Sequence, residues 1–160
     1  MKIFREKTHG IREIEGMGKY DAYLLATLFD IRGRIHCRPP EKTEEYSEEH
    51  FAPEIEIWSK DKNLKIIWEE WGGCFYEPQK YKRYGWVLGQ WRGRPQRQRF
   101  LQKILPFLQV NNLQAALALK MLAGLEKKTK GKWTEKDLQE NKAWASEMKR
   151  LNHETRTRVR

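Results

Sequence analysis

A long run without acidic side chains is the part of the sequence best suited to bind a polyanion. Between Glu77 and Glu126 there is no aspartate or glutamate, and nine basic residues give this segment a charge of +9. The basic residues are Lys80, Lys82, Arg83, Arg92, Arg94, Arg97, Arg99, Lys103 and Lys120. Four aromatic residues are interspersed with them: Tyr81, Tyr84, Trp86 and Trp91. Basic side chains contact phosphates and aromatic rings stack on bases. The segment therefore predicts salt-sensitive nucleic-acid binding, with a solvated basic face as the alternative.

The region before this run has the opposite charge. Between Arg32 and Trp58 four basic and seven acidic residues give a net charge of −3. Glu54 and Glu56 could accept hydrogen bonds from cytosine amino groups, but so many carboxylates repel a phosphate backbone. The acidic charge of this region is evidence against a simple DNA-binding sheet, and a protein partner is an alternative.

The elements that would position these residues follow from hydrophobic periodicity and from the glycines and prolines. Helices are predicted over 19–32, 60–71, 95–108, 113–125 and 134–151, the last with a capping box of Thr134 and Asp137. Strands are predicted over 34–38, 51–57, 74–76 and 84–91. Pro53 indicates an edge position or a bulge in its strand, and Gly33 is expected to end the first helix with a positive φ.

This order of elements predicts an α+β fold, a four-stranded antiparallel sheet with helices on one face. The other face is then free to touch a partner. We expect a basic N-terminal arm over 1–18, a single domain over 19–152 and a basic tail over 153–160 that is frayed unless bound.

The helix over 19–32 has two apolar stripes on opposite sides. One stripe comprises Leu24, Thr27, Leu28 and Ile31, and the other comprises Ala22, Leu25, Ala26 and Phe29. A helix that is apolar nearly all round is buried on both sides. One stripe can face the domain's own sheet, and the other then needs a partner such as a second copy of this helix. A central core helix in a monomer is the alternative.

Composition narrows the class of protein. The 160 residues carry a formal charge of +10 with a pI of about 9.6, which favours nucleic acid as the partner and not a membrane. Cys37 and Cys74 lack the spacing of a metal site and are expected to be reduced, each in or near a strand. Nothing near Met1 resembles a signal peptide. We expect a cytoplasmic protein, associated with the nucleoid, or an organellar one in a eukaryote.

Three stretches resemble the single-motif LAGLIDADG homing endonucleases. Residues 25–33, LATLFDIRG, resemble the motif that names the family. Residues 100–108, FLQKILPFL, followed by Val110 and by 114–120, QAALALK, are similar to its later helix pair. The last helix, with Trp144, Met148, Leu151, Asn152, Thr155 and Arg156, is similar to its C-terminal region. The resemblance covers residues 19–158, and the element order derived above is the αββαββα order of that family.

The resemblance implies a homodimer in which two motif helices pack at the dimer axis. The expected interface residues are Leu24, Thr27, Leu28 and Ile31. Small residues let such helices approach closely, and here the bulkier Thr27 takes the position of the motif's glycine. The resemblance therefore predicts a dimer with different helix spacing.

The resemblance also implies a catalytic site, which this sequence departs from. The family's cleavage depends on an acid just before the last motif glycine, which binds divalent metal over the scissile phosphates. Arg32 occupies that position and cannot ligate Mg²⁺. Asp30 corresponds to a residue that caps the helix or joins the interface. Ser59 and Asn63 fall near the glutamine-like and arginine-like positions, and Asn111 falls at the lysine-like position. These departures together predict a dead nuclease centre.

The sequence therefore predicts a DNA-binding protein without nuclease activity, a candidate regulator of transcription that needs no cofactor. Double-stranded DNA and a second copy are the expected partners. The expected DNA contacts are Arg32, Arg34, Arg38, Lys80, Lys82, Arg83, Arg92, Arg94, Arg97, Arg156 and Arg158. Three alternatives stay open: an active Mg²⁺-dependent endonuclease with unusual ligands such as Asp30 or Glu56, an RNA-binding splicing helper like a maturase, and a protein-interaction module.

Overall fold

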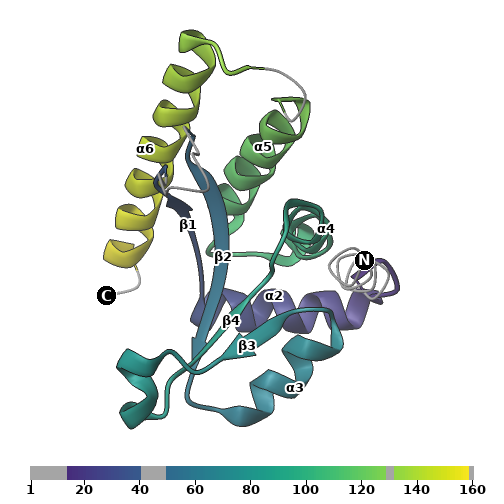
Figure 1. The fold of residues 1–160 in the computed structure, drawn as a ribbon. Coiled ribbons are helices and arrows are strands. Elements are labelled where there is room, and N and C mark those ends of the chain that lie inside the picture. The colour runs from purple at the N-terminus through teal and green to yellow at the C-terminus, as the bar shows by residue number, and fades with distance from the viewer. Residues whose placement is uncertain (1–13, 41–49, 129–131, 159–160) are drawn as a thin grey trace, which may run out of the picture. The chain divides into compact units, whose positions relative to one another are not determined.

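The computed structural model describes residues 14–40, 50–128 and 132–158 of the chain. Most of the predicted arm, the segment 41–49 with five of the seven acidic residues between Arg32 and Trp58, and the end of the tail lie outside these residues. The first half of the described chain contains α2 (Lys19–Arg32), β1 (Gly33–Arg38), β2 (Ala52–Ser59), α3 (Lys62–Glu70) and β3 (Cys74–Tyr76). The second half contains the 3₁₀ helix η1 (Gln79–Tyr84), β4 (Val87–Gln90), α4 (Arg94–Ile104), the 3₁₀ helix η2 (Leu105–Phe107), α5 (Asn112–Lys128) and α6 (Glu135–Arg158). This order confirms the predicted α+β class (Figure 1).

The four strands form one antiparallel sheet in the order β1-β2-β4-β3. Glu56 pairs with Gln90 and Ile57 with Gly89 across β2 and β4, and Cys74 pairs with the same Gln90 across β3 and β4. Of the two alternatives predicted from Pro53, the edge position is wrong, because β2 is an inner strand. On the β4 side Pro53 costs no ladder bond, since the pairing of β2 with β4 begins only at Glu56.

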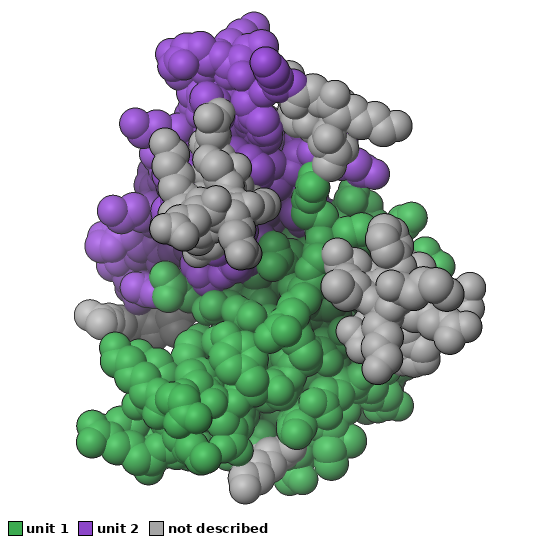
Figure 2. All heavy atoms as spheres, in the orientation of Figure 1, with its two compact units in different colours: residues 1–34, 55–109 green, residues 35–54, 110–160 purple. Residues whose placement is uncertain are grey.

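The chain divides into two compact units, residues 1–34 with 55–109 and residues 35–54 with 110–160 (Figure 2). An aromatic cluster forms the core of the first unit. The Trp91 ring stacks on Phe100 with centroids 3.6 Å apart, and Trp68 lies 3.8 Å from Trp91. Phe29 of α2 meets Phe100 edge-on at 6.2 Å. Because all four rings are buried, this cluster ties α2, α3 and α4 to the end of β4.

The second unit is built on the pair α5 and α6, which pack against each other. Gln114 of α5 donates to the carbonyl of Leu151 at 3.3 Å and to Thr155 at 2.7 Å. Asn152 of α6 donates to the carbonyl of Ile35 in β1 at 2.8 Å. Amide side chains, buried at Gln114 and half-buried at Asn152, therefore satisfy backbone carbonyls of α6 and β1.

Several local predictions are corrected. Gly33 ends α2 with a φ of −83°, so no positive φ is needed. A Cβ there would lie 2.3 Å from the Phe29 ring, so close approach explains the glycine. The strand predicted over 84–91 is limited to β4, because the basic turn before it forms η1. The predicted end of α6 near residue 151 is wrong, since α6 continues to Arg158.

Other local predictions are confirmed. The backbone amide of Thr134 donates to Asp137 at 2.9 Å, and the amide of Asp137 donates to the Thr134 hydroxyl at 3.2 Å, which is the capping box of α6. Cys37 lies on β1 and Cys74 on β3. Among the described helices, none combines the length and the apolar run that a membrane crossing requires.

Candidate nucleic-acid interface

The end of α2 presents a guanidinium to solvent. Arg32 is the last residue of the helix and its side chain is exposed. A cation in the last turn is stabilised by the negative end of the helix dipole. Guanidinium groups donate five hydrogen bonds and accept none, so this position does not fit a divalent metal ion. It does fit an anionic group such as a phosphate.

Asp30 is used to join two elements of the first unit. Its Oδ2 accepts a hydrogen bond of 2.6 Å from the backbone amide of Gln109, just after η2. The carboxylate thus fixes the chain that leaves η2 to the last turn of α2. This contact leaves Asp30 poorly placed to replace a metal-binding acid at the position of Arg32.

The other departures from the family's site have local structural tasks. The buried Ser59 hydroxyl accepts a 2.9 Å bond from the amide of Asp61. The Asp61 carboxylate in turn caps α3 by accepting a 2.8 Å bond from the amide of Asn63, whose own side chain is exposed. Asn111 is buried beside the start of α5 in the second unit, where its carbonyl accepts from Ala115. Ser59 and Asn63 therefore meet through Asp61, in the turn that starts α3.

One stripe of α2 is buried in the first unit and the other is left open. Ala22, Leu25, Ala26 and Phe29 are buried, as the sequence predicts. Of the opposite stripe, Thr27 and Ile31 are exposed, and Leu24 and Leu28 are half-buried. The hydroxyl of Thr27 donates to the carbonyl of Tyr23 at 2.9 Å, so it is satisfied within its own helix. Tyr20 adds an exposed ring to the open stripe.

In the first unit the sheet has a polar and aromatic face, the open face, on the side opposite the buried Ile57. In the first unit the register places Glu56 of β2 beside Gln90 of β4, and Trp58 beside Leu88. Side chains alternate along a strand, so these residues share the face opposite the buried Ile57. Gln90 Nε2 donates to Glu56 Oε1 at 3.1 Å, and Trp58 Nε1 lies 3.4 Å from Glu56 Oε2. The charge of Glu56 is therefore engaged by two donors on its own face.

An open pocket of about 330 Å³ lies on this face of the first unit. Its lining residues are Arg34, Glu56, Trp58, Tyr81 and Trp86. Trp58 and Tyr81 meet edge-on with centroids 5.4 Å apart. Lys60 Nζ lies 5.2 Å from the centre of the Trp86 ring, and Lys80 Nζ lies 5.5 Å from that of Tyr81. Aromatic rings, one carboxylate and nearby cations therefore meet at one place.

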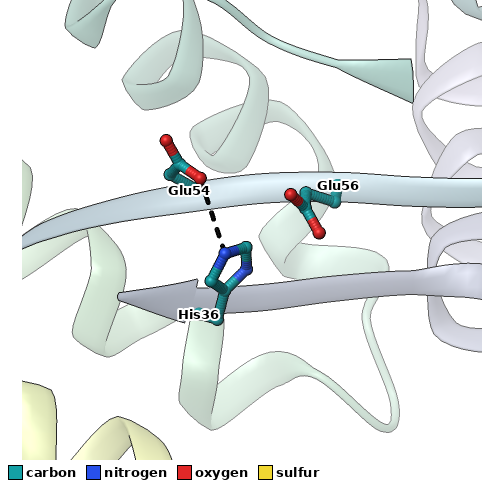
Figure 3. A group of neighbouring side chains, drawn as sticks. All are labelled: His36, Glu54 and Glu56. Carbon is teal, nitrogen blue, oxygen red and sulfur yellow. Dashed lines mark ion pairs between the residues drawn. The ribbon is translucent and has the colours of Figure 1, made fainter. Parts of the chain in front are cut away.

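In the second unit, β1 and β2 bring a histidine and two further charged side chains together. His36 Nε2 lies 3.5 Å from Glu54 Oε2 across the two strands, as Figure 3 shows, with Glu56 two residues further along β2. Arg38 Nε lies 3.2 Å from Glu54 Oε1. Glu54 is thus shared between two basic side chains. The Arg38 guanidinium compensates the charge of Glu54 and so reduces the repulsion that this residue would exert on a polyanion.

The basic residues predicted to bind nucleic acid differ in how far they are engaged. Lys80, Lys82 and Arg83 are exposed on η1, where the Arg83 guanidinium lies 4.6 Å from the Tyr84 ring centre. Arg92 lies 5.9 Å from the ring of Tyr76. Arg94 is half-buried at the start of α4. Arg156 is exposed on α6, and the side chain of Arg158 lies outside the described residues.

Two residues of the basic run have structural tasks that the sequence does not reveal. Arg97 Nε donates to the carbonyl of Trp91 at 2.8 Å, which holds the start of α4 to the end of β4. The Trp91 ring is fully buried, so the expectation that Trp91 stacks on nucleic acid is wrong. Conversely, the structure adds Trp58 and Gln90 to the open face. Their positions follow from the register of β2 with β4, which periodicity alone does not specify.

The fold is that of solved homing endonucleases. The chain of I-CvuI bound to its target in the presence of Ca superposes with a TM-score of 0.66 at 19% identity, covering 83% of this chain and 82% of that one. A second I-CvuI complex, with the I-CreI target in the presence of Mg, gives 0.65 at 20% identity, covering 84% and 85%. The archaeal intron-encoded I-Vdi141I complexed with DNA gives 0.68 at 14% identity, covering 82% and 84%.

No family model matches the sequence, and no curated protein gives a significant match. The fold and the resemblance to homing endonucleases predicted from the sequence are confirmed by the solved structures. At these identities the likeness defines the fold, and the chemistry has to be argued from the residues of this chain.

Proposed function

We propose that this protein binds double-stranded DNA through the open face of its sheet and does not cut it. The observation that carries the proposal is Arg32, an exposed guanidinium at the end of the motif helix in a fold shared with solved homing endonucleases. Those endonucleases are described as complexes with DNA. A protein that holds DNA without cutting it can act by occluding a site, as a regulator of transcription does.

The charge of the molecule supports the same partner. The basic residues of η1 are exposed beside the open face of the first unit, where Glu56 accepts a hydrogen bond from Gln90. Such a face attracts a phosphate backbone because the three basic residues of η1 outnumber Glu56, the one carboxylate that lines the pocket. Binding is then expected to weaken steeply as salt concentration rises.

The open stripe of α2 supports a homodimer as the binding unit. Leu24, Thr27, Leu28 and Ile31 form an apolar strip with no polar group in need of water, since the Thr27 hydroxyl is satisfied within the helix. Two copies of this strip would bury each other about a two-fold axis, which is the commonest symmetry of soluble oligomers. Two Arg32 side chains would then serve one duplex.

Metal dependence of binding distinguishes this proposal from an active endonuclease. We would titrate fluorescent random-sequence duplexes with protein at low salt, in EDTA and in Ca²⁺, and follow anisotropy. The wild-type protein is expected to bind equally well in both, because Arg32 holds phosphate directly. Arg32→Ala is expected to bind more weakly and with a smaller salt slope, again without an effect of Ca²⁺.

Arg32→Asp is the sharper variant. It is expected to bind weakly in EDTA and to recover affinity in Ca²⁺, because a carboxylate at this position can share a cation with phosphate. Tighter binding of the wild-type protein in Ca²⁺ than in EDTA would contradict the proposal and favour an endonuclease. Binding of structured RNA in preference to duplex DNA would favour the splicing helper, and no binding at micromolar protein would remove the nucleic-acid function.

A further inference from the structure

We propose that the pocket on the open face holds a single unstacked nucleobase, so that the preferred partner is a duplex with one base out of its stack. This inference rests on the proposed DNA binding and names the form of DNA that this site selects. The pocket lies wholly within the first unit, where Trp58 of β2, Tyr81 of η1 and Trp86 before β4 contribute its aromatic walls.

The size of the pocket suits one small planar group. At about 330 Å³ it lies at the lower end of the range of about 300–1,000 Å³ that small-molecule sites span. Trp58 and Tyr81 stand at 86° to each other, so a planar ring that stacks on one presents its edge to the other. This edge-to-face geometry is one that aromatic groups prefer.

Polar groups at the pocket match the edge of a base. The Glu56 carboxylate is held by Gln90 and Trp58, yet two carboxylate oxygens offer about four acceptor sites in all. A carboxylate in the lining is a suitable acceptor for the amino or ring N–H group of a base. Arg34, also in the lining, offers donors for ring nitrogens or carbonyl oxygens.

The surrounding charge favours a nucleic acid over a cationic ligand. A pocket of aromatic rings with one carboxylate is also the form of site that takes methylated ammonium groups. Here Arg34 lines the pocket, and Lys60 and Lys80 already lie against the rings of Trp86 and Tyr81. These three cations repel a further cation and are placed to meet the phosphates on either side of an unstacked base.

The energy of unstacking a base determines which DNA binds best. Taking a paired base out of a duplex costs unstacking and unpairing energy, which a bulged base has already lost. Stacking on an aromatic side chain then adds affinity. A duplex with a one-base bulge is therefore expected to bind about five- to 150-fold more tightly than the fully paired duplex.

Three duplexes of equal length test this inference by anisotropy: fully paired, with a one-base bulge, and with an abasic bulge that lacks only the ring. The wild-type protein is expected to prefer the base bulge over both others. Trp58→Ala and Tyr81→Ala should reduce that preference to the abasic level, and Trp58→Phe should keep most of it. In the two alanine variants, affinity for the paired duplex should fall less than affinity for the base bulge, so that the ratio of the two affinities is what changes.

Tyr84→Ala is the matched control, because Tyr84 is an exposed ring on the same 3₁₀ helix that does not line the pocket. It should keep the full preference. Equal binding of base and abasic bulges, with tight binding of the paired duplex, would overturn this inference and leave the proposed function intact. No binding of any duplex would overturn both. A trimethyl-lysine peptide that competes with the bulged duplex for the wild-type protein but not for Trp58→Ala would show that the pocket binds an ammonium group. That result would overturn the inference that it holds a nucleobase.

Discussion

The carboxylate of Asp30 in α2 accepts a hydrogen bond of 2.6 Å from the backbone amide of Gln109, 79 residues further along the chain. A charged acceptor makes this bond stronger than one between neutral groups. The bond fixes the exit of η2 against the motif helix in the first unit. Asp30 is therefore explained by the fold, whereas Arg32 at the exposed end of the same helix carries the proposed phosphate contact.

Loss of this carboxylate should lower stability. Asp30→Ala is expected to reduce the free energy of unfolding by about 1–2 kcal/mol, because the Gln109 amide loses its charged acceptor. Asp30→Asn keeps an acceptor and should cost less. Urea denaturation followed by circular dichroism measures both, with Glu70→Ala on the exposed side of α3 as a control expected to change by less than about 0.5 kcal/mol. An Asp30→Ala protein as stable as wild type would show that the bond contributes nothing.

The open stripe of α2 should control the oligomeric state. Ile31→Glu places a charge in the proposed dimer interface and is expected to give a monomer in light scattering. Ile66→Glu on α3 is a close control, because both isoleucines are 68% exposed. The control should remain a dimer. If both variants behave alike, exposed apolar surface in general and not this stripe determines association.

The exposed basic residues of η1 should determine the salt dependence of DNA binding. Each phosphate contact contributes about one to the slope of log K against log salt. Lys82→Ala removes two such contacts from a homodimer, so the slope is expected to fall by about two. Arg150→Ala serves as a control, because Arg150 is bonded to Glu147 and Glu154 on α6 and these pairs hold its charge locally. Equal slopes for Lys82→Ala and wild type would show that Lys82 makes no phosphate contact and that DNA binds at another surface.

Cys37 should be the less reactive thiol. Burial raises its pKa to about 12, and its Sγ lies 3.6 Å from Met121 Sδ. Burial also raises the pKa of Cys74, but the nearby Arg92 opposes that rise. Because only the thiolate reacts, iodoacetamide at pH 8 is expected to modify Cys74 first and Cys37 only on unfolding. Peptide mass spectrometry distinguishes the two sites, and faster labelling of Cys37 would contradict the buried position.

The raised pKa of Cys37 makes the free energy of unfolding depend on pH. The folded protein keeps the Cys37 proton up to about pH 12, whereas the unfolded chain loses it near 9. The contribution of the Cys37 thiol to the stability of the folded protein is therefore fully present below pH 9 and is lost as pH rises toward 12. The difference in stability between wild type and Cys37→Ala should shrink over that range.

The sequence predicts the elements well because each carries a local signal. The periodicity of α2, the glycines after α3 and the capping box of Thr134 and Asp137 act over a few residues. The two stripes of α2 are visible for the same reason. Errors arise where tertiary packing decides, as for Trp91, which completes the aromatic core, and Gly33, which makes room for the ring of Phe29.

The candidate site is harder to predict from the sequence than the elements are, because the pairing of strands brings its residues together. Arg32 and the basic run can be found from position and composition alone. The engagement of Glu56 by Gln90 depends on a register between strands 34 residues apart, and a slip by one residue would turn one of them to the other face. The pocket of Trp58, Tyr81 and Trp86 also needs the turn into η1, which the sequence presents only as a basic loop.

The most direct test of the account combines selection with cleavage. Duplexes would be selected from a random-sequence pool by binding to the wild-type protein in EDTA, and the selected DNA would then be incubated with protein and Mg²⁺ or Mn²⁺. The lengths of the strands would be read on a denaturing gel. We expect the pool to be enriched by binding and every selected duplex to stay at full length. Discrete fragments that appear only with the metal ion would contradict it and show that a nuclease centre survives despite Arg32.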